Sequence, residues 1–256
     1  MLLRPDHAEP AIPVLRKLVR ENPLGILTTA IRSDIAPFIQ SSHIPFVLDV
    51  KDEDSTEELG VLRGHIARQN PQSKVLIEAA KASKSSTPNV LEEEVLVLFT
   101  PPSHQHYVTP KFYTETKPST GKVVPTWNYS AVQAYGRAKI YWDHKSDESI
   151  AFLSKQIADL SEHAETSVMG FTGKGDRQGS WKVSDAPERF IELLRTNIIG
   201  IEIQLDRLEG KFKMSQEMSL GDREGVVKGF ANLGTETATV VSGLVKERSD
   251  LMESKS

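Results

Sequence analysis

Residues 59–74 read LGVLRGHIARQNPQSK and predict a strand that runs almost directly into a helix. Strand alternation divides the side chains between two faces: Arg63, His65, Ala67 and Gln69 on one, and Gly64, Ile66, Arg68 and Asn70 on the other. The pair Asn70-Pro71 then predicts the start of a short helix through Ala82, because proline is well tolerated in the first helical turn.

This strand-to-helix junction has the features of an anion site. The start of the predicted helix, Pro71 to Lys74, offers free backbone N–H groups, which favour a negative charge. Arg68 precedes these groups and Lys74 lies in the first turn, and a guanidinium suits a phosphate better than an ammonium alone. The alternative, an exposed basic strand end without a ligand, stays open on this segment alone.

Three further segments combine polar and aromatic side chains. Residues 40–46, QSSHIPF, place Ser42 and His43 among apolar residues, a mixture that suits a flavin-like ring or an ordinary strand end. Residues 107–113 and 124–129 (VPTWNY, with Trp127) place aromatic rings beside prolines, either as core or as a stacking surface. Residues 210–216, GKFKMSQ, are polar and basic and follow a strongly predicted strand. They form either part of a binding site or an ordinary surface turn.

Strand-like runs fill the first half of the chain, and the clearest helices follow at 145–165, 186–197 and 235–252. Phe190, Leu193 and Leu194 are expected to face inward from the second of these helices. Since strands and helices do not alternate, a doubly wound parallel sheet is disfavoured, and a closed or split antiparallel barrel with peripheral helices is predicted. We expect a barrel domain over residues 1–230 and a C-terminal helical extension over 231–256.

Composition excludes several classes of function. The 256 residues carry a formal net charge of −4 and no cysteine, which argues against a nucleic-acid coat, disulfides and thiolate metal sites. No signal peptide or membrane span is recognisable, so a cytoplasmic protein is expected. The glycines around 173–175 lack nucleotide-binding spacing, and no serine hydrolase elbow occurs. His104 and His106 could share a strand face, but further ligands would have to be distant, so no metal site is predicted.

The chain resembles the PaiB family, also called FMN-binding negative transcriptional regulators, of the FMN-binding split-barrel superfamily. The matching stretches keep their order over residues 1–229 and include NPLG at 22–25, SHIPF at 42–46, LRGHIARQNP at 62–71, PTWNY at 125–129 and LEGK at 208–211. The resemblance implies a six-stranded split barrel, a homodimer, and an FMN site at the dimer interface. The loops at 82–89 and 166–179, and His104 and His106, depart from the family pattern.

Residues carried over from the resemblance join those of the anion site in one predicted FMN-binding set. The set comprises Ser42, His43, His65, Ala67, Arg68, Asn70, Lys74, Trp127, Lys213, Ser215 and Gln216. Lys213, Ser215 and Gln216 are expected to reach the cofactor from the other subunit, and no catalytic side chain is predicted.

Three functions stay open at this point. The first is a flavin-dependent oxidoreductase or flavin reductase, in which FMN carries the electron chemistry. The second is a transcriptional regulator that acts indirectly, since no helix-turn-helix with a basic face is recognisable and direct nucleic-acid binding is not expected. The third is haem binding or degradation with His43, His65, His104 or His106 as axial ligands.

Overall fold

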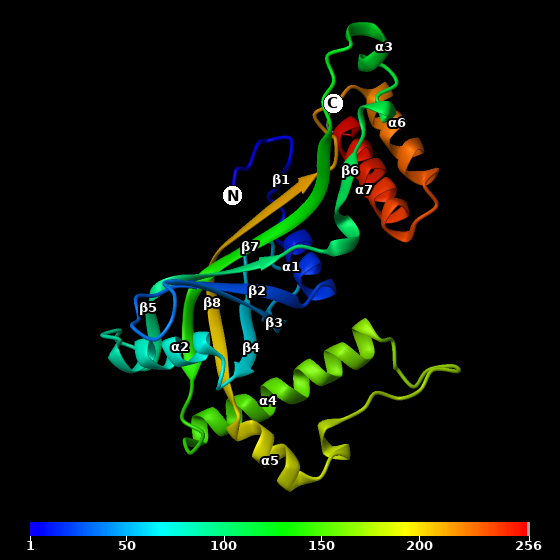
Figure 1. The fold of residues 1–256 in the computed structure, drawn as a ribbon. Coiled ribbons are helices and arrows are strands. Elements are labelled where there is room, and N and C mark those ends of the chain that lie inside the picture. Colours follow the sequence, from blue (N-terminus) through cyan, green and yellow to red (C-terminus); the bar gives the residue numbers. More distant parts are fainter. Residues whose placement is uncertain (255–256) are drawn as a thin grey trace. The chain divides into compact units, whose positions relative to one another are not determined.

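The structure, a computed structural model, describes residues 1–254 and divides them into two compact units (Figure 1). The barrel unit comprises Ala11–Phe99 and Gln133–Leu208, and the helical unit comprises Met1–Pro10, Thr100–Val132 and 209–254. The expected division of the chain at residue 230 stays a prediction about domains. Residues 255 and 256, the end of the predicted extension, lie outside the described residues. No helix within 1–254 is both long and apolar enough to cross a membrane.

Six strands close into a barrel, which confirms the predicted fold class. Their order around the ring is β8-β4-β3-β2-β5-β7, and a further pairing of β7 with β8 closes it. Adjacent pairs such as β2–β3, β3–β4 and β4–β8 are antiparallel, with His65 opposite Gly200 in the last pair. The six strands span Leu24–Ala30 (β2), Ile39–Asp49 (β3), Val61–Ala67 (β4), Val90–Phe99 (β5), Thr126–Tyr141 (β7) and Ile198–Lys213 (β8).

Alternate apolar side chains fill the barrel. Along β3 the buried residues are Ile44, Phe46 and Leu48, and the residues between them are only half-buried. Phe46 meets Phe99 of β5 in an edge-to-face contact with ring centroids 6.1 Å apart. On β4, Leu62 and Ile66 are separated by an even number of positions and are both buried, so they lie on the face that points into the barrel. The period of two therefore leaves His65 and Ala67 on the outer face of β4.

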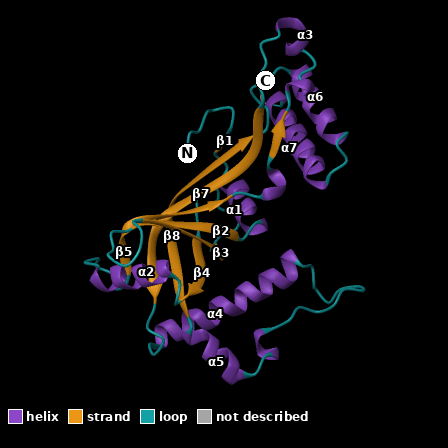
Figure 2. Ribbon diagram, viewed as in Figure 1, coloured by secondary structure: helices purple, strands orange, loops and turns teal. Residues whose placement is uncertain are grey.

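Helices of the barrel unit cover parts of its outside and its ends (Figure 2). Helix α2 begins at Pro71 and ends at Ala82, as predicted from the sequence. Helix α4 is anchored through Arg63 of β4, whose guanidinium binds Asp49, Gln156 and Asp159. The helices and short turns of this unit are α1 (Ile12–Glu21), α2 (Pro71–Ala82), α4 (Asp147–His163), a π-turn at Ala164–Val168, a 3-10 turn at Val183–Asp185 and α5 (Glu188–Thr196).

Helix α5 forms where the sequence predicts it, but its apolar side chains are not inward. Phe190, Leu193 and Leu194 remain 52%, 61% and 46% exposed, and no residue of α5 is buried. The expectation that these three residues pack inward is therefore wrong. Helical periodicity gives the apolar face of a helix, but it does not say what covers that face.

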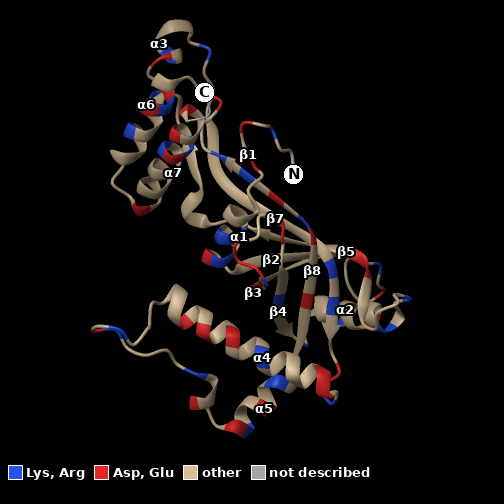
Figure 3. Cartoon of the chain, turned by 180° about the vertical axis from the view of Figure 1, so that it is seen from behind, with Lys and Arg blue, Asp and Glu red and all other residues tan. Residues whose placement is uncertain are grey.

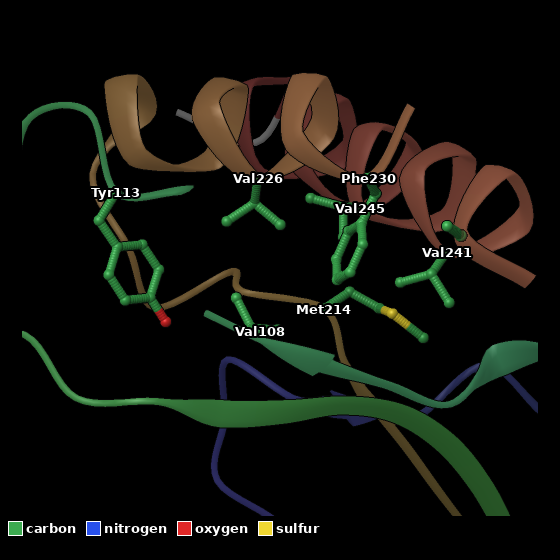
Figure 4. Packing of buried hydrophobic residues seen from close by; sticks show 8 residues of the cluster. Val108, Tyr113, Met214, Val226, Phe230, Val241 and Val245 are labelled. Atoms are coloured by element: carbon green, nitrogen blue, oxygen red, sulfur yellow. The ribbon is translucent and has the colours of Figure 1, made fainter. Parts of the chain in front are cut away.

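The helical unit has its own core beneath α6 (Leu220–Ala231) and α7 (Glu236–Glu253). Figure 4 shows Val226, Phe230 and Val245 pointing from these helices toward Met214 and Val108. The remaining elements of the unit are β1 (Ala8–Glu9), which pairs with β8, β6 (His106–Val108), which pairs with β7, the short helix α3 (Thr116–Thr120), and 3-10 turns at Pro102–His104 and Pro110–Phe112. Helix α7 confirms the helix predicted at 235–252.

Candidate functional site

Asn70 joins the start of α2 to strand β3. Its Oδ1 accepts a hydrogen bond from the backbone N–H of Gln72 at 2.9 Å, the usual role of a helix N-cap. Its Nδ2 donates to the hydroxyl of Ser42 at 3.1 Å. Pro71 fixes the first helical position, where no backbone donor is required. The junction predicted from the sequence therefore brings two predicted site residues, Asn70 and Ser42, into contact.

Further hydroxyl and basic side chains lie on the elements that meet at this junction, and alternation puts Ser41 and His43 on the opposite face of β3 from Ser42. Thr28 lies opposite Ser41 in the β2–β3 register, and their hydroxyls are 2.9 Å apart. His43 is exposed on β3, and Lys74 is exposed in the first turn of α2. We call Ser42, His43, Asn70 and Lys74 the helix-start cluster. The Ser42 hydroxyl and the Lys74 ammonium lie at the start of α2, where an anion is favoured.

Arg68 has partners that the sequence did not indicate. Its Nε donates to the carbonyl of Thr196 at 3.0 Å, and its Nη2 donates to the carbonyls of Trp142 and Ile198 at 2.7 and 3.3 Å. Burial lowers the pKa of Arg68, and Asp143 counteracts that effect. Within residues 1–254, only Nη1 of this side chain makes no hydrogen bond. A contact of Arg68 with phosphate stays a prediction, and it would run through that nitrogen.

His65 and Ala67 border an apolar pocket of about 390 Å³ on the outside of the barrel. The pocket also touches α4, α5 and the segment around Trp181. The Nδ1 atom of His65 is buried and has no hydrogen-bond partner among the described residues. Burial lowers the pKa of His65, so the imidazole is neutral at neutral pH. We call this space the outer pocket.

Trp127 and Lys213 come together in the helical unit. Lys213 Nζ donates to the hydroxyl of Thr126 at 2.7 Å and to the carbonyl of Trp127 at 3.0 Å. The Trp127 ring is 57% exposed and makes an edge-to-face contact with Tyr107, with centroids 6.1 Å apart. An exposed indole with a fixed lysine beside its backbone is suited to contact a ring-bearing ligand.

Ser215 and Gln216 support the turn after β8. Ser215 is buried with a positive φ of 63°, and its hydroxyl is 3.1 Å from Nδ2 of Asn128. Gln216 Oε1 accepts from the N–H of Met214 at 2.6 Å, and its Nε2 donates to the carbonyl of Phe212 at 2.6 Å. These bonds occupy both side chains within the turn. Their predicted contact with the cofactor stays a prediction.

Sequence reasoning missed several features of these sites. The Thr28–Ser41 pair depends on strand register, and Trp181 enters the outer pocket from a loop, so neither leaves a local signal. His104 lies 2.6 Å from the hydroxyl of Ser130, and the His106 ring packs on Phe230. In the part of the chain that the structure describes, no three His, Cys, Asp or Glu side chains gather as a metal site.

The chain matches one family model and is similar to several known proteins. The model of a family described as "Putative FMN-binding domain" matches residues 1–207. A protein of Aspergillus fumigatus is 59% identical over 263 residues, with 100% of both chains covered. The Bacillus subtilis protein named protease synthase and sporulation protein PAI 2 is 26% identical over 239 residues, covering 93% of this chain and 89% of its own. A conserved hypothetical protein of Mycobacterium tuberculosis, with a solved structure, is 12% identical, covers 86% of this chain and 94% of its own, and has a TM-score of 0.47.

The family match settles the resemblance that the ordered motifs indicated. It extends over more than half of the chain, from the first residue through most of β8. It includes β3, the β4–α2 junction and the PTWNY stretch, on which the predicted similarity to PaiB proteins was based. The chain therefore belongs to the family described as "Putative FMN-binding domain".

Proposed function

We propose that this chain binds FMN and acts as a flavin-dependent oxidoreductase or flavin reductase. Family membership over residues 1–207 is the observation that carries the proposal. The helix-start cluster supports it locally, because Asn70 ties Ser42 to the first turn of α2 and leaves the cluster's donors beside a helix N-terminus. FMN supplies the electron transfer when bound, and the protein binds and orients it.

Each residue of the helix-start cluster has a stated role in the proposal. Ser42 donates a hydrogen bond to the phosphate, Lys74 supplies a positive charge, and His43, on the opposite face of β3 from Ser42, stays a predicted contact. Asn70 is a positioning residue, since both ends of its amide are already bonded to the protein. Arg68 adds its remaining Nη1 donors.

The cofactor site lies at the interface of a homodimer in this proposal. Trp127 and Lys213 then contact the flavin bound by the other subunit, and Ser215 and Gln216 hold the turn that presents Lys213. Sedimentation of the full chain at micromolar concentration should give a dimer. A monomer would remove the second subunit's contribution to the site.

Titration of the full chain with FMN tests the proposal. We expect saturable binding by calorimetry and a rise in melting temperature with added FMN. Lys74→Ala should weaken binding by about tenfold, as expected for the loss of one charge-assisted contact. Lys84→Ala, just beyond the other end of α2, is the matched control and should bind normally. A protein whose melting temperature ignores FMN, or equal affinities for both variants, would contradict this site.

Oxidoreductase activity needs its own measurement. The FMN-loaded protein should oxidise NADH or NADPH with reduction of the flavin, seen as bleaching of its visible absorbance under anaerobic conditions. A flavin that stays oxidised with both NADH and NADPH would contradict the proposed reductase activity. The titration with FMN would still test cofactor binding independently.

Any transcriptional role is proposed to be indirect. Basic residues are interleaved with acidic ones along α6 and α7, as Figure 3 shows. Sequence-independent DNA binding depends on a concentrated positive surface, whose contacts release counterions. A gel-shift assay with genomic fragments at physiological salt should therefore give no specific complex. A salt-resistant complex would favour direct regulation.

A further inference from the structure

The outer pocket is large enough for a small ring system and has a mostly apolar wall. Its apolar wall includes Ile157 of α4, Leu194 of α5, and Trp181 from the segment before α5. Its volume of about 390 Å³ lies in the range of small-molecule sites. Arg63, two residues before His65, bonds to Gln156 and Asp159 of α4 and so fixes that helix beside β4.

The wall formed by α5 is only partly covered by the part of the chain that the structure describes. Leu194 borders the pocket yet is 46% exposed, and Trp181 is 44% exposed. No residue of α5 is buried, although its apolar residues recur at helical spacing. Apolar surface of this kind gains free energy when an occupant removes it from water.

The polar part of the pocket is positive and incompletely bonded. Arg195 lines it, donates from Nη1 to the hydroxyl of Ser154 at 2.9 Å, and pairs with no carboxylate within residues 1–254. No Asp or Glu lines the pocket. His65 adds a buried Nδ1 atom without a partner. A buried polar atom left unbonded is costly, so a ligand that satisfies it is favoured.

We propose that the outer pocket binds a small aromatic carboxylate, with its ring against Trp181, Ile157 and Leu194 and its carboxylate between Arg195 and His65. A guanidinium matches a carboxylate in charge and in geometry. A neutral imidazole with its proton on Nδ1 donates to the same group. The site is separate from the helix-start cluster, and it goes beyond the proposed function because it does not depend on FMN.

Calorimetric titration of the full chain with two matched probes tests the proposal. The probes are 1-naphthoate and its neutral counterpart 1-naphthamide. We expect naphthoate to bind about tenfold or more tightly than naphthamide, because only the anion pairs with Arg195. Arg195→Gln should weaken naphthoate binding by several-fold and change naphthamide binding little, and His65→Phe should weaken the binding of both probes, because a neutral imidazole donates to an amide carbonyl as well as to a carboxylate. Saturating FMN should leave naphthoate affinity unchanged.

Two tryptophan substitutions on α5 test the location independently of those polar side chains. Leu194→Trp fills the pocket edge and should abolish naphthoate binding. Leu193→Trp, at the neighbouring position that does not border the pocket, should not. Circular dichroism checks that both variants fold. No naphthoate binding, equal affinity for both probes, equal behaviour of the two variants, or displacement of naphthoate by FMN would each overturn the proposal.

Discussion

Arg68→Ala separates a structural role of this side chain from a role in binding phosphate. The substitution removes one hydrogen bond to Thr196 and two to Trp142 and Ile198, all to backbone carbonyls. A hydrogen bond from a charged donor contributes about 1.5–3 kcal/mol when it is well buried. Arg68 is only half-buried, and the bond to Ile198 is long at 3.3 Å, so water can replace part of the loss. We therefore expect a loss of about 2 kcal/mol in the free energy of unfolding.

Urea unfolding followed by tryptophan fluorescence measures this change, and the midpoint should fall without a change in slope. Arg189→Ala, an exposed arginine on α5, is the matched control and should shift stability by less than about 0.5 kcal/mol. Lys74→Ala should leave stability unchanged and weaken FMN binding. If Arg68→Ala were as stable as the natural chain and lost FMN affinity, the carbonyl contacts would be irrelevant and the guanidinium would belong to the phosphate.

Other substitutions test the two units. Arg63→Met should destabilise the barrel unit by about 2 kcal/mol in urea, because it leaves the buried Gln156 Oε1 without its donor and Asp49 without its ion pair. Lys155→Ala, at the exposed side of the same network, should cost less than about 1 kcal/mol. Gly225→Ala should cost about 2 kcal/mol, since its Cβ would lie 2.1 Å from the Phe112 carbonyl, whereas Gly243→Ala, with open space around it, should gain up to about 1 kcal/mol by thermal unfolding. Burial acts to raise the pKa of Asp159, but Lys155 and Arg63 outweigh it and hold that pKa below its ordinary 3.8. The charged form of Asp159 therefore contributes its full stability above pH 3.8, and this contribution is lost as the pH falls through the lower pKa of the folded state. In Asp159→Asn, the urea concentration at the unfolding midpoint should therefore decrease less as the pH is lowered.

Local patterns predicted the barrel well because its strands alternate strongly. The β4–α2 junction also follows from its own residues, since Asn70-Pro71 supplies both a cap and a favoured first position, and α2 begins at Pro71. Helix α6 escaped prediction because Gly221, Gly225 and Gly229 weaken its helical signal. The structure explains two of these glycines, as Gly225 approaches the Phe112 backbone and Gly229 approaches the Phe112 ring.

The candidate sites were less predictable, because side-chain partners come from distant parts of the chain. Arg68 illustrates this, since its carbonyl partners follow it by 74 to 130 residues. Residue type alone indicated a free guanidinium, but the barrel end supplied carbonyl acceptors that no local pattern reveals. Ser215 shows the same limit, since its partner Asn128 lies 87 residues before it. Gln216 differs, because its partners Met214 and Phe212 are local and belong to the turn itself.

Residues 59–74 predicted one cofactor site from the sequence. In the structure, the side chains of this stretch lie in several different surroundings, and the geometry of strand β4 explains why. Its outward side chains begin with Arg63, which is bonded to α4, and continue with His65 and Ala67, which border the outer pocket. The strand ends at Ala67, Arg68 follows it and bonds to backbone carbonyls, and Asn70 caps α2 and bonds to Ser42. The resemblance and the anion-site argument assign His65, Ala67, Arg68, Asn70 and Ser42, but not Arg63, to one cofactor. Alternation and the turn at the strand end instead direct them to different surroundings, so each residue needs its own test.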